Sequence, residues 1–202
     1  MNGYSDRINH ALAFAAKHHD QQVRKGARPP YLTRAANVAV ILTRYDCSET
    51  CVVAGILHDA VEDSAQSGWT HAMLSARIGE KFGEHALASA LAVSRRRADD
   101  NGNELDRAER GTDLLARLPE ADEAARWVLA ANHVHSGNAL LADLRRTMDA
   151  DSVWQRFAGG RSTTLAWHRE VHAALERCHF AAPIMVELRT TLQELEATPA
   201  SG

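Results

Sequence analysis

Four titratable side chains stand close together at the end of an otherwise apolar stretch: His58, Asp59, Glu62 and Asp63. On a helix, side chains three or four positions apart share a face, so this spacing gathers all four at one helix end. Burying such groups is costly unless they pair, so the cluster indicates a functional site, and the alternative is a polar helix end in solvent. Imidazole and carboxylate groups suit either a Mn²⁺ or Fe²⁺ site or acid–base chemistry without a metal.

The elements that position this cluster are predicted to be helices. Alanine and leucine, with 36 and 20 residues, greatly outnumber valine and isoleucine, with 12 and 5, and apolar positions mostly recur every three or four residues. Predicted helices cover residues 6 to about 22, 33–45, 51 to about 63, 71 to about 83, 84–93, 105–118, 120 to about 148, 151–157, 163–178 and 183–195. We therefore predict an all-α fold with a single domain over residues 1–202, with residues 51–63 as its central helix.

Composition and charge exclude several classes of protein. The net charge of -3 provides no positive field to hold a polyanion, so we expect no nucleic-acid partner. No apolar run reaches 18 residues and no signal peptide is recognisable, so we expect no membrane partner and a cytoplasmic location. Three cysteines, two of them four residues apart, fit neither a disulfide framework nor a zinc ribbon.

The block His58-Asp59 with Glu62-Asp63, after an apolar helix, resembles the HD superfamily of metal-dependent phosphohydrolases. Its surroundings are similar to the small alarmone hydrolases and to the hydrolase domain of the RelA/SpoT enzymes. The matching segments follow the family's order between about residues 10 and 176: 13–22, 24–25, 30–33, 38–39, 58–63, 82–83, 154–157 and 165–167. The resemblance implies an HD-type helical bundle, with the predicted helix 183–195 following the matched region.

The same resemblance implies four metal ligands, and only two of them are present. His58 and Asp59 supply the His-Asp doublet, whereas the family's first histidine falls on Arg34 and its last aspartate on Asn132. Ser136 replaces the asparagine that usually closes the later motif. A guanidinium is a permanently charged donor and an amide oxygen is neutral, so we expect no metal cofactor and a loss of metal-activated hydrolysis.

Charge balance suggests what takes the place of the cation. Two neutral histidines and two aspartates around a divalent ion sum to zero, and so do His58, Asp59, Asn132 and a cationic Arg34. We hypothesise that the arginine occupies the metal's position and binds an anionic or carbonyl oxygen.

The resemblance also implies where a ligand would lie. It places Arg24 and Lys25 beside a purine and its phosphates, and Glu62 and Asp63 near the attacking water. The expected partner is therefore an anionic small molecule, nucleotide-like under this resemblance, although Arg24 and Lys25 also fit a solvated loop. The run of three arginines at 95–97 is predicted to be a solvated surface loop, and Trp127, Trp154 and Trp167 are predicted to be core residues.

Three functions remain open. The first is a metal-independent acid–base enzyme that uses the four clustered residues, with Arg34, Asn132 and Ser136 in the binding pocket. The second is a non-catalytic protein that binds a nucleotide or a regulatory partner in the old pocket. The third is a phosphohydrolase that binds Mn²⁺ through a rebuilt ligand set including His135 or Glu62. The sequence predicts neither the substrate nor the oligomeric state.

Overall fold

The computed structural model describes residues 4–20, 30–62, 70–99 and 101–198, where every element longer than an isolated bridge is a helix. The all-α prediction is therefore confirmed. The helices are α1 (Asp6–His18), α2 (Leu32–Arg44), α3 (Glu49–Glu62), α4 (His71–Phe82), α5 (Glu84–Val93), α6 (Arg107–Arg117), the short 3₁₀ helix η2 (Leu118–Glu120), α7 (Glu123–Arg145), α8 (Ala150–Trp154), α9 (Gly160–Arg177) and α10 (Ile184–Ala197). None of these helices combines the length and hydropathy that a membrane span requires.

Helix α3 lies at the centre of the bundle, as its apolar sequence predicted. Every residue from 51 to 61 is buried, and the helix packs against α1, α2, α4, α5 and α7. Gly55 allows α2 to approach closely, because a Cβ atom added at this position would lie 2.5 Å from a methyl group of Leu42. Polar groups at the end of α3 are therefore enclosed on several sides.

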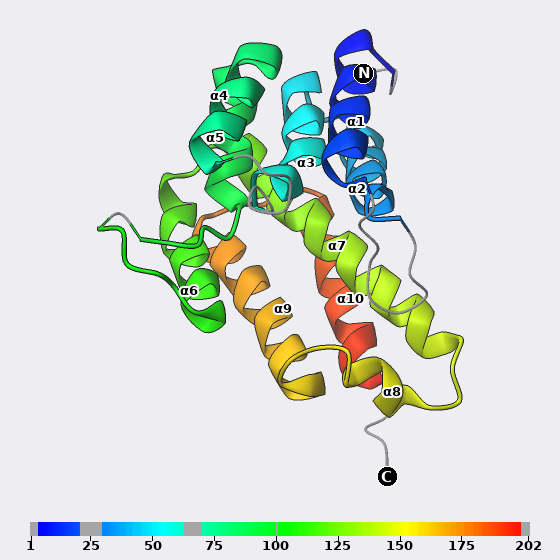
Figure 1. The fold of residues 1–202 in the computed structure, drawn as a ribbon. Coiled ribbons are helices and arrows are strands. Elements are labelled where there is room, and N and C mark those ends of the chain that lie inside the picture. The colour runs from blue at the N-terminus through cyan, green and yellow to red at the C-terminus, as the bar shows by residue number, and fades with distance from the viewer. Residues whose placement is uncertain (1–3, 21–29, 63–69, 100, 199–202) are drawn as a thin grey trace.

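Helix α7 connects the two parts of the bundle. In Figure 1 it runs across the middle of the molecule, with α1 to α5 above it and α6, α9 and α10 below. It contacts α2, α3 and α5 on one side and α8, α9 and α10 on the other. The main hydrophobic core surrounds α3 and the first half of α7, and a smaller apolar cluster lies where α7 meets α8, α9 and α10.

Helix boundaries follow the local capping signals. Ser5, Ser48 and Thr70 each accept a hydrogen bond from a backbone N–H three residues later, as expected of N-caps, and α5 has the predicted bounds. Predicted and observed helix boundaries differ more at other helices. Helix α1 ends at His18, four residues early, and α9 begins three residues early because Gly159 adopts a left-handed conformation with φ 82°.

Candidate functional site

Three helices that are far apart in the sequence bring a guanidinium, a carboxylate and an amide together. Arg34 lies in the first turn of α2, Asp59 near the end of α3 and Asn132 in the middle of α7. The Arg34 Nε atom lies 3.1 Å from Asp59 Oδ2 and 3.0 Å from Asn132 Oδ1. The Nε–H group therefore donates to Asn132 while the guanidinium charge pairs with Asp59, although residues 34 and 132 are 98 positions apart.

His58 completes this network as a neutral ring. Its Nδ1 atom lies 2.8 Å from the carbonyl oxygen of Gly55, which can only accept, so Nδ1 carries the proton. Its Nε2 atom lies 3.3 Å from Asp59 Oδ1. Burial lowers the pKa of His58, and the Arg34 charge acts in the same direction, while Asp59 opposes both. At neutral pH the Nε2 atom therefore carries a lone pair.

The amide of Asn132 fits this arrangement better than a carboxylate would. Its Oδ1 atom accepts a hydrogen bond from the Arg34 Nε–H group at 3.0 Å. A second carboxylate at this position would leave the buried cluster with an unbalanced negative charge.

Asp59 is the buried anion of the network. Its side chain is only 2% exposed, whereas that of Arg34 is 23% exposed. A carboxylate enclosed in this way needs a close cation, and Arg34 provides it. Tyr31 lies on the outer side of the guanidinium, with its hydroxyl oxygen 3.4 Å from Arg34 Nη1.

Glu62 lies one turn beyond His58 on α3, at the edge of the network. Burial raises the pKa of its carboxyl, and the nearby charge of Asp59 raises it further. Its Oε2 atom accepts the backbone N–H of Arg95 at 3.2 Å, while the Ser94 hydroxyl donates to the carbonyl oxygen of His58 at 3.1 Å. These contacts attach the end of α5 to the end of α3. The carboxyl can therefore exchange a proton closer to neutral pH than an ordinary glutamate does.

Four further residues were predicted for the site. Three of them, Arg24, Lys25 and Asp63, lie outside the described residues. Ser136 is half-buried and lies one helical turn beyond Asn132 on α7. The structure thus brings together His58, Asp59, Glu62, Arg34 and Asn132 of the predicted set.

A second group of polar residues was not anticipated as a site. His133 on α7 meets His168 on α9, with their Nδ1 atoms 3.3 Å apart, and both rings are buried. Burial lowers the pKa of His168 to about 4 and holds the pKa of His133 well below its usual value, so both rings are neutral at pH 7. One Nδ1 atom therefore donates and the other accepts.

The prediction of a solvated loop at residues 95–97 is wrong for its first two members. The Arg95 guanidinium lies over the Trp167 ring, 4.5 Å from its centroid, and Arg96 is paired with Asp113 at 2.6 Å. Arg97 alone is exposed. Nothing in the local sequence distinguishes these arginines, because their partners come from α6 and α9. Trp167 is partly buried and packs against the main core, as predicted for a core residue.

The arrangement differs from the donor set of a divalent cation. Within the described residues, no group of three histidine, cysteine, aspartate or glutamate side chains is placed so that it could hold a metal ion. A cation between His58 and Asp59 would be repelled by the guanidinium charge of Arg34, whose Nε atom lies 3.1 Å from Asp59 Oδ2.

Comparison with known proteins identifies sequence relatives over short stretches. A GTP pyrophosphokinase from Myxococcus xanthus is 41% identical over 59 residues, which are 29% of this chain and 8% of the relative. A probable GTP pyrophosphokinase from Mycobacterium leprae (strain TN) is 36% identical over 76 residues, 38% of this chain and 9% of the relative. The matches therefore span less than a tenth of the length of these relatives.

Solved structures share the fold over most of the chain. A metazoan ortholog of SpoT, described as hydrolysing ppGpp and acting in starvation responses, has a TM-score of 0.71 and 21% identity, covering 95% of this chain and 96% of that one. The protein lmo0812 from Listeria monocytogenes EGD-e has a TM-score of 0.63 and 22% identity, covering 79% and 96%. The sequence model of the HD domain matches residues 11–131, more than half of the chain. The chain therefore belongs to the HD domain family.

Proposed function

We propose that this protein is an HD-fold enzyme that works without a metal ion, by acid–base chemistry on an anionic or carbonyl-bearing small molecule. One observation carries the proposal: the Arg34 guanidinium lies between Asp59 and Asn132, two positions that resemble metal-ligand positions of the family. A fixed cation there can bind an anionic or developing negative oxygen. It cannot lower the pKa of a bound water from ~16 to ~7, as a metal does.

The other residues have complementary roles in this proposal. Glu62 is the group that exchanges a proton with the substrate, because its raised pKa places proton transfer nearer to neutrality. His58, held neutral with its lone pair at Nε2, is the second proton acceptor. Asp59 keeps the Arg34 guanidinium in place. Arg34 is 23% exposed at its side chain, so a ligand can reach it from solvent.

Binding without catalysis is the second candidate, and the closure of the network favours it. Arg34 contacts both Asp59 and Asn132, and Asp59 contacts His58, as in a purely structural polar cluster. Since the relatives are named for GTP pyrophosphokinase and ppGpp hydrolysis, guanine nucleotides are the first ligands to examine. Tight nucleotide binding with no turnover, unchanged in His58→Ala, would support this candidate against the first.

The decisive experiment is a metabolite screen with metal-free protein. The native protein, His58→Gln and Glu62→Gln are incubated with a mixture of small anionic metabolites in the presence of a chelator. We expect the native protein to consume a compound that Glu62→Gln consumes at least about a hundredfold more slowly, in line with the usual contribution of a general acid or base. Consumption only after Mn²⁺ is added, with release of pyrophosphate from a guanosine bis-diphosphate, would establish the phosphohydrolase instead.

Metal content provides an independent test. Protein purified without chelator should contain no stoichiometric manganese, iron or zinc, and Arg34→His combined with Asn132→Asp should gain affinity for Mn²⁺. Micromolar or tighter metal binding by the native protein would contradict the proposed role of Arg34. If the double variant gains no affinity, the correspondence of these two positions to metal ligands is wrong.

A further inference from the structure

Glu62, at the edge of the candidate site, also lines a cavity of about 570 Å³. The other lining residues include Ser94 and come mainly from the end of α3, the end of α5 and the loop that follows α5. Part of its wall is apolar, formed by Val61, Leu91 and Ala92. The volume is within the range of sites that bind small molecules.

Four arginines, at positions 95, 96, 97 and 117, give the remaining wall a strong positive charge. Asp113 pairs with Arg96 and Arg117, and Glu62 contacts the backbone of Arg95. The cavity therefore has more cationic than anionic groups along its lining, in a protein whose net charge is -3. An apolar wall facing a cationic wall suits a ligand that is apolar at one end and anionic at the other.

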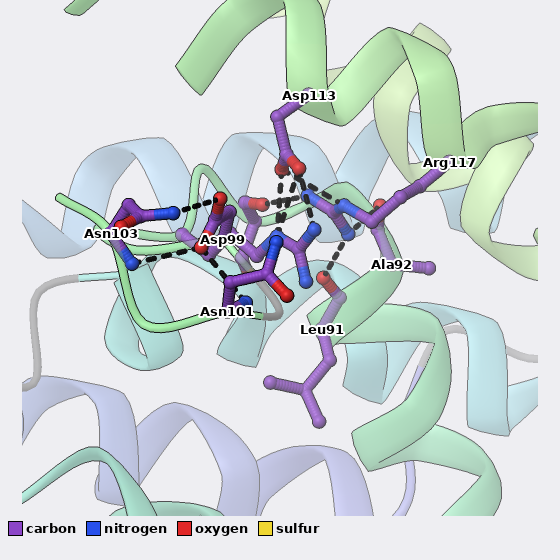
Figure 2. Close-up of polar contacts among 9 residues, drawn as sticks. Leu91, Ala92, Asp99, Asn101, Asn103, Asp113 and Arg117 are labelled. Atoms are coloured by element: carbon purple, nitrogen blue, oxygen red, sulfur yellow. Dashed lines mark hydrogen bonds and ion pairs between the residues drawn. The ribbon is translucent and has the colours of Figure 1, made fainter. Parts of the chain in front are cut away.

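Two of these arginines hold the wall together. Figure 2 shows Arg117 reaching back to the carbonyl oxygens of Leu91 and Ala92, with Asp113 beside it. Arg117 also donates to the carbonyl oxygen of Ser94 at 2.8 Å, and Asp113 accepts from both Nε and Nη2 of Arg96. These bonds fix the loop after α5. They leave Arg95 and Arg97 as the two cations that can respond to a ligand.

Arg95 is held in an unusual setting for a cation. Its guanidinium lies over the Trp167 ring at 4.5 Å and is largely buried, which lowers its pKa, as do the nearby charges of Arg34 and Arg107. Glu62 is the carboxyl group that opposes this effect. A buried cation with two further arginines near it is stabilised when an anion approaches. Arg97, exposed at the rim, can meet the same anion from the solvent side.

We propose that this cavity binds a small molecule with a phosphate or carboxylate held by Arg95 and Arg97 and an apolar body packed on Val61, Leu91 and Ala92. Such a ligand lies against Glu62, so it would be the substrate of the site; this last step rests on the proposed function. The binding step does not depend on that chemistry.

The test uses simple probes and the full-length chain. Phenyl phosphate, benzoate, phenol and inorganic phosphate are titrated by calorimetry and by NMR of the arginine side-chain N–H signals. We expect saturable binding of phenyl phosphate or benzoate, about tenfold or more tighter than phenol or inorganic phosphate, with shifts at Arg95 and Arg97. The tighter of the two anions identifies the head group. Binding of phenol as tight as that of the anions would overturn the proposal. So would a lack of saturation by either anion at about 20 mM, because specific binding has a dissociation constant far below that concentration.

Variants locate the site. Arg97→Gln should weaken binding of the preferred anion about tenfold and leave phenol binding unchanged, because the lost contact is to the charged group. Arg77→Gln, which removes an arginine on α4 whose side chain is 43% exposed and lies outside the cavity lining, is the matched control. Equal weakening by both variants would mean a general charge effect and no site. Arg34→Met should abolish the proposed catalysis yet retain the bound anion, so failure of the proposed function and failure of this inference give different results.

Discussion

Two arginine–carboxylate clusters lie on either side of Glu62, and they differ in what surrounds them. Asp59 is 2% exposed and faces one guanidinium, that of Arg34, inside the bundle. Asp113 is 14% exposed and faces two guanidinium groups, those of Arg96 and Arg117, at the base of a loop. The first cluster is a closed network with an amide and an imidazole, whereas the second anchors backbone carbonyls beside an open cavity. The same type of ion pair, arginine with aspartate, thus stabilises the candidate site in one region and the wall of the cavity in the other.

Arg34→Met should produce the largest change, because it leaves Asp59 buried without its cation. We expect a loss of about 3 kcal/mol in the free energy of unfolding, measured by urea denaturation at pH 7. Adding Asp59→Asn to this variant removes the unpaired charge and should restore about half of the loss. If Arg34→Met costs less than about 1 kcal/mol, the pair is no more important than a surface ion pair.

The pair of buried histidines, His133 and His168, should make stability depend on pH. The pKa of His168 is lowered to about 4 from an ordinary value of 6.5, so the unfolded chain binds more protons below pH 6.5. Stability is therefore greatest above pH 6.5 and falls as the pH drops towards 4. The contribution of this one group is about 2–3 kcal/mol.

His168→Asn tests this contribution, since asparagine keeps a polar group near the Nδ1 position and does not titrate. The variant should lose less stability than the native protein between pH 7 and pH 4, as followed by thermal unfolding. His85→Asn, at an exposed position on α5, serves as control. Identical pH profiles for the native protein and His168→Asn would show that the lowered pKa is wrong.

Arg117→Met should have the smallest of the three effects. It removes hydrogen bonds to the carbonyl oxygens of Leu91, Ala92 and Ser94, and the ion pair with Asp113, but water can replace several of these at a partly exposed site. We expect a loss of about 1–2 kcal/mol, together with faster amide hydrogen exchange at residues 94–105.

The matched control for Arg117→Met is Arg77→Met, which breaks an exposed ion pair with Glu80 on α4. It should cost less than about 0.5 kcal/mol. If Arg117→Met behaves like this control, the cluster around Asp113 does not anchor the loop.

Local sequence signals predicted much of the fold. Ser5 and Thr70 cap their helices through hydrogen bonds that span three residues, and α5 begins directly after Gly83, as its sequence indicates. The end of α7 was predicted three residues too late, and its start three residues too early because Asp122 is the N-cap and residues 118–120 form a separate short 3₁₀ helix. Such boundaries depend on one or two hydrogen bonds, which periodicity does not register.

The candidate site was predictable only in part. Spacing grouped His58, Asp59 and Glu62, since these lie within two turns of one helix, and the family resemblance added Arg34 and Asn132. Neither could show that Arg34 contacts both Asp59 and Asn132, because that depends on how α2, α3 and α7 pack. The prediction that the arginines at 95–97 form a solvated loop was wrong for Arg95 and Arg96 for the same reason.

The amino-acid sequence by itself determined the helices, the apolar centre of α3 and the polar block at its end, because each follows from contacts within a few residues. The tertiary structure alone decided that Arg34 pairs with Asp59, that Arg95 lies over Trp167 and that a basic cavity adjoins Glu62. Those contacts join helices separated by tens of residues, and their free energy depends on burial, which exists only once the helices have packed.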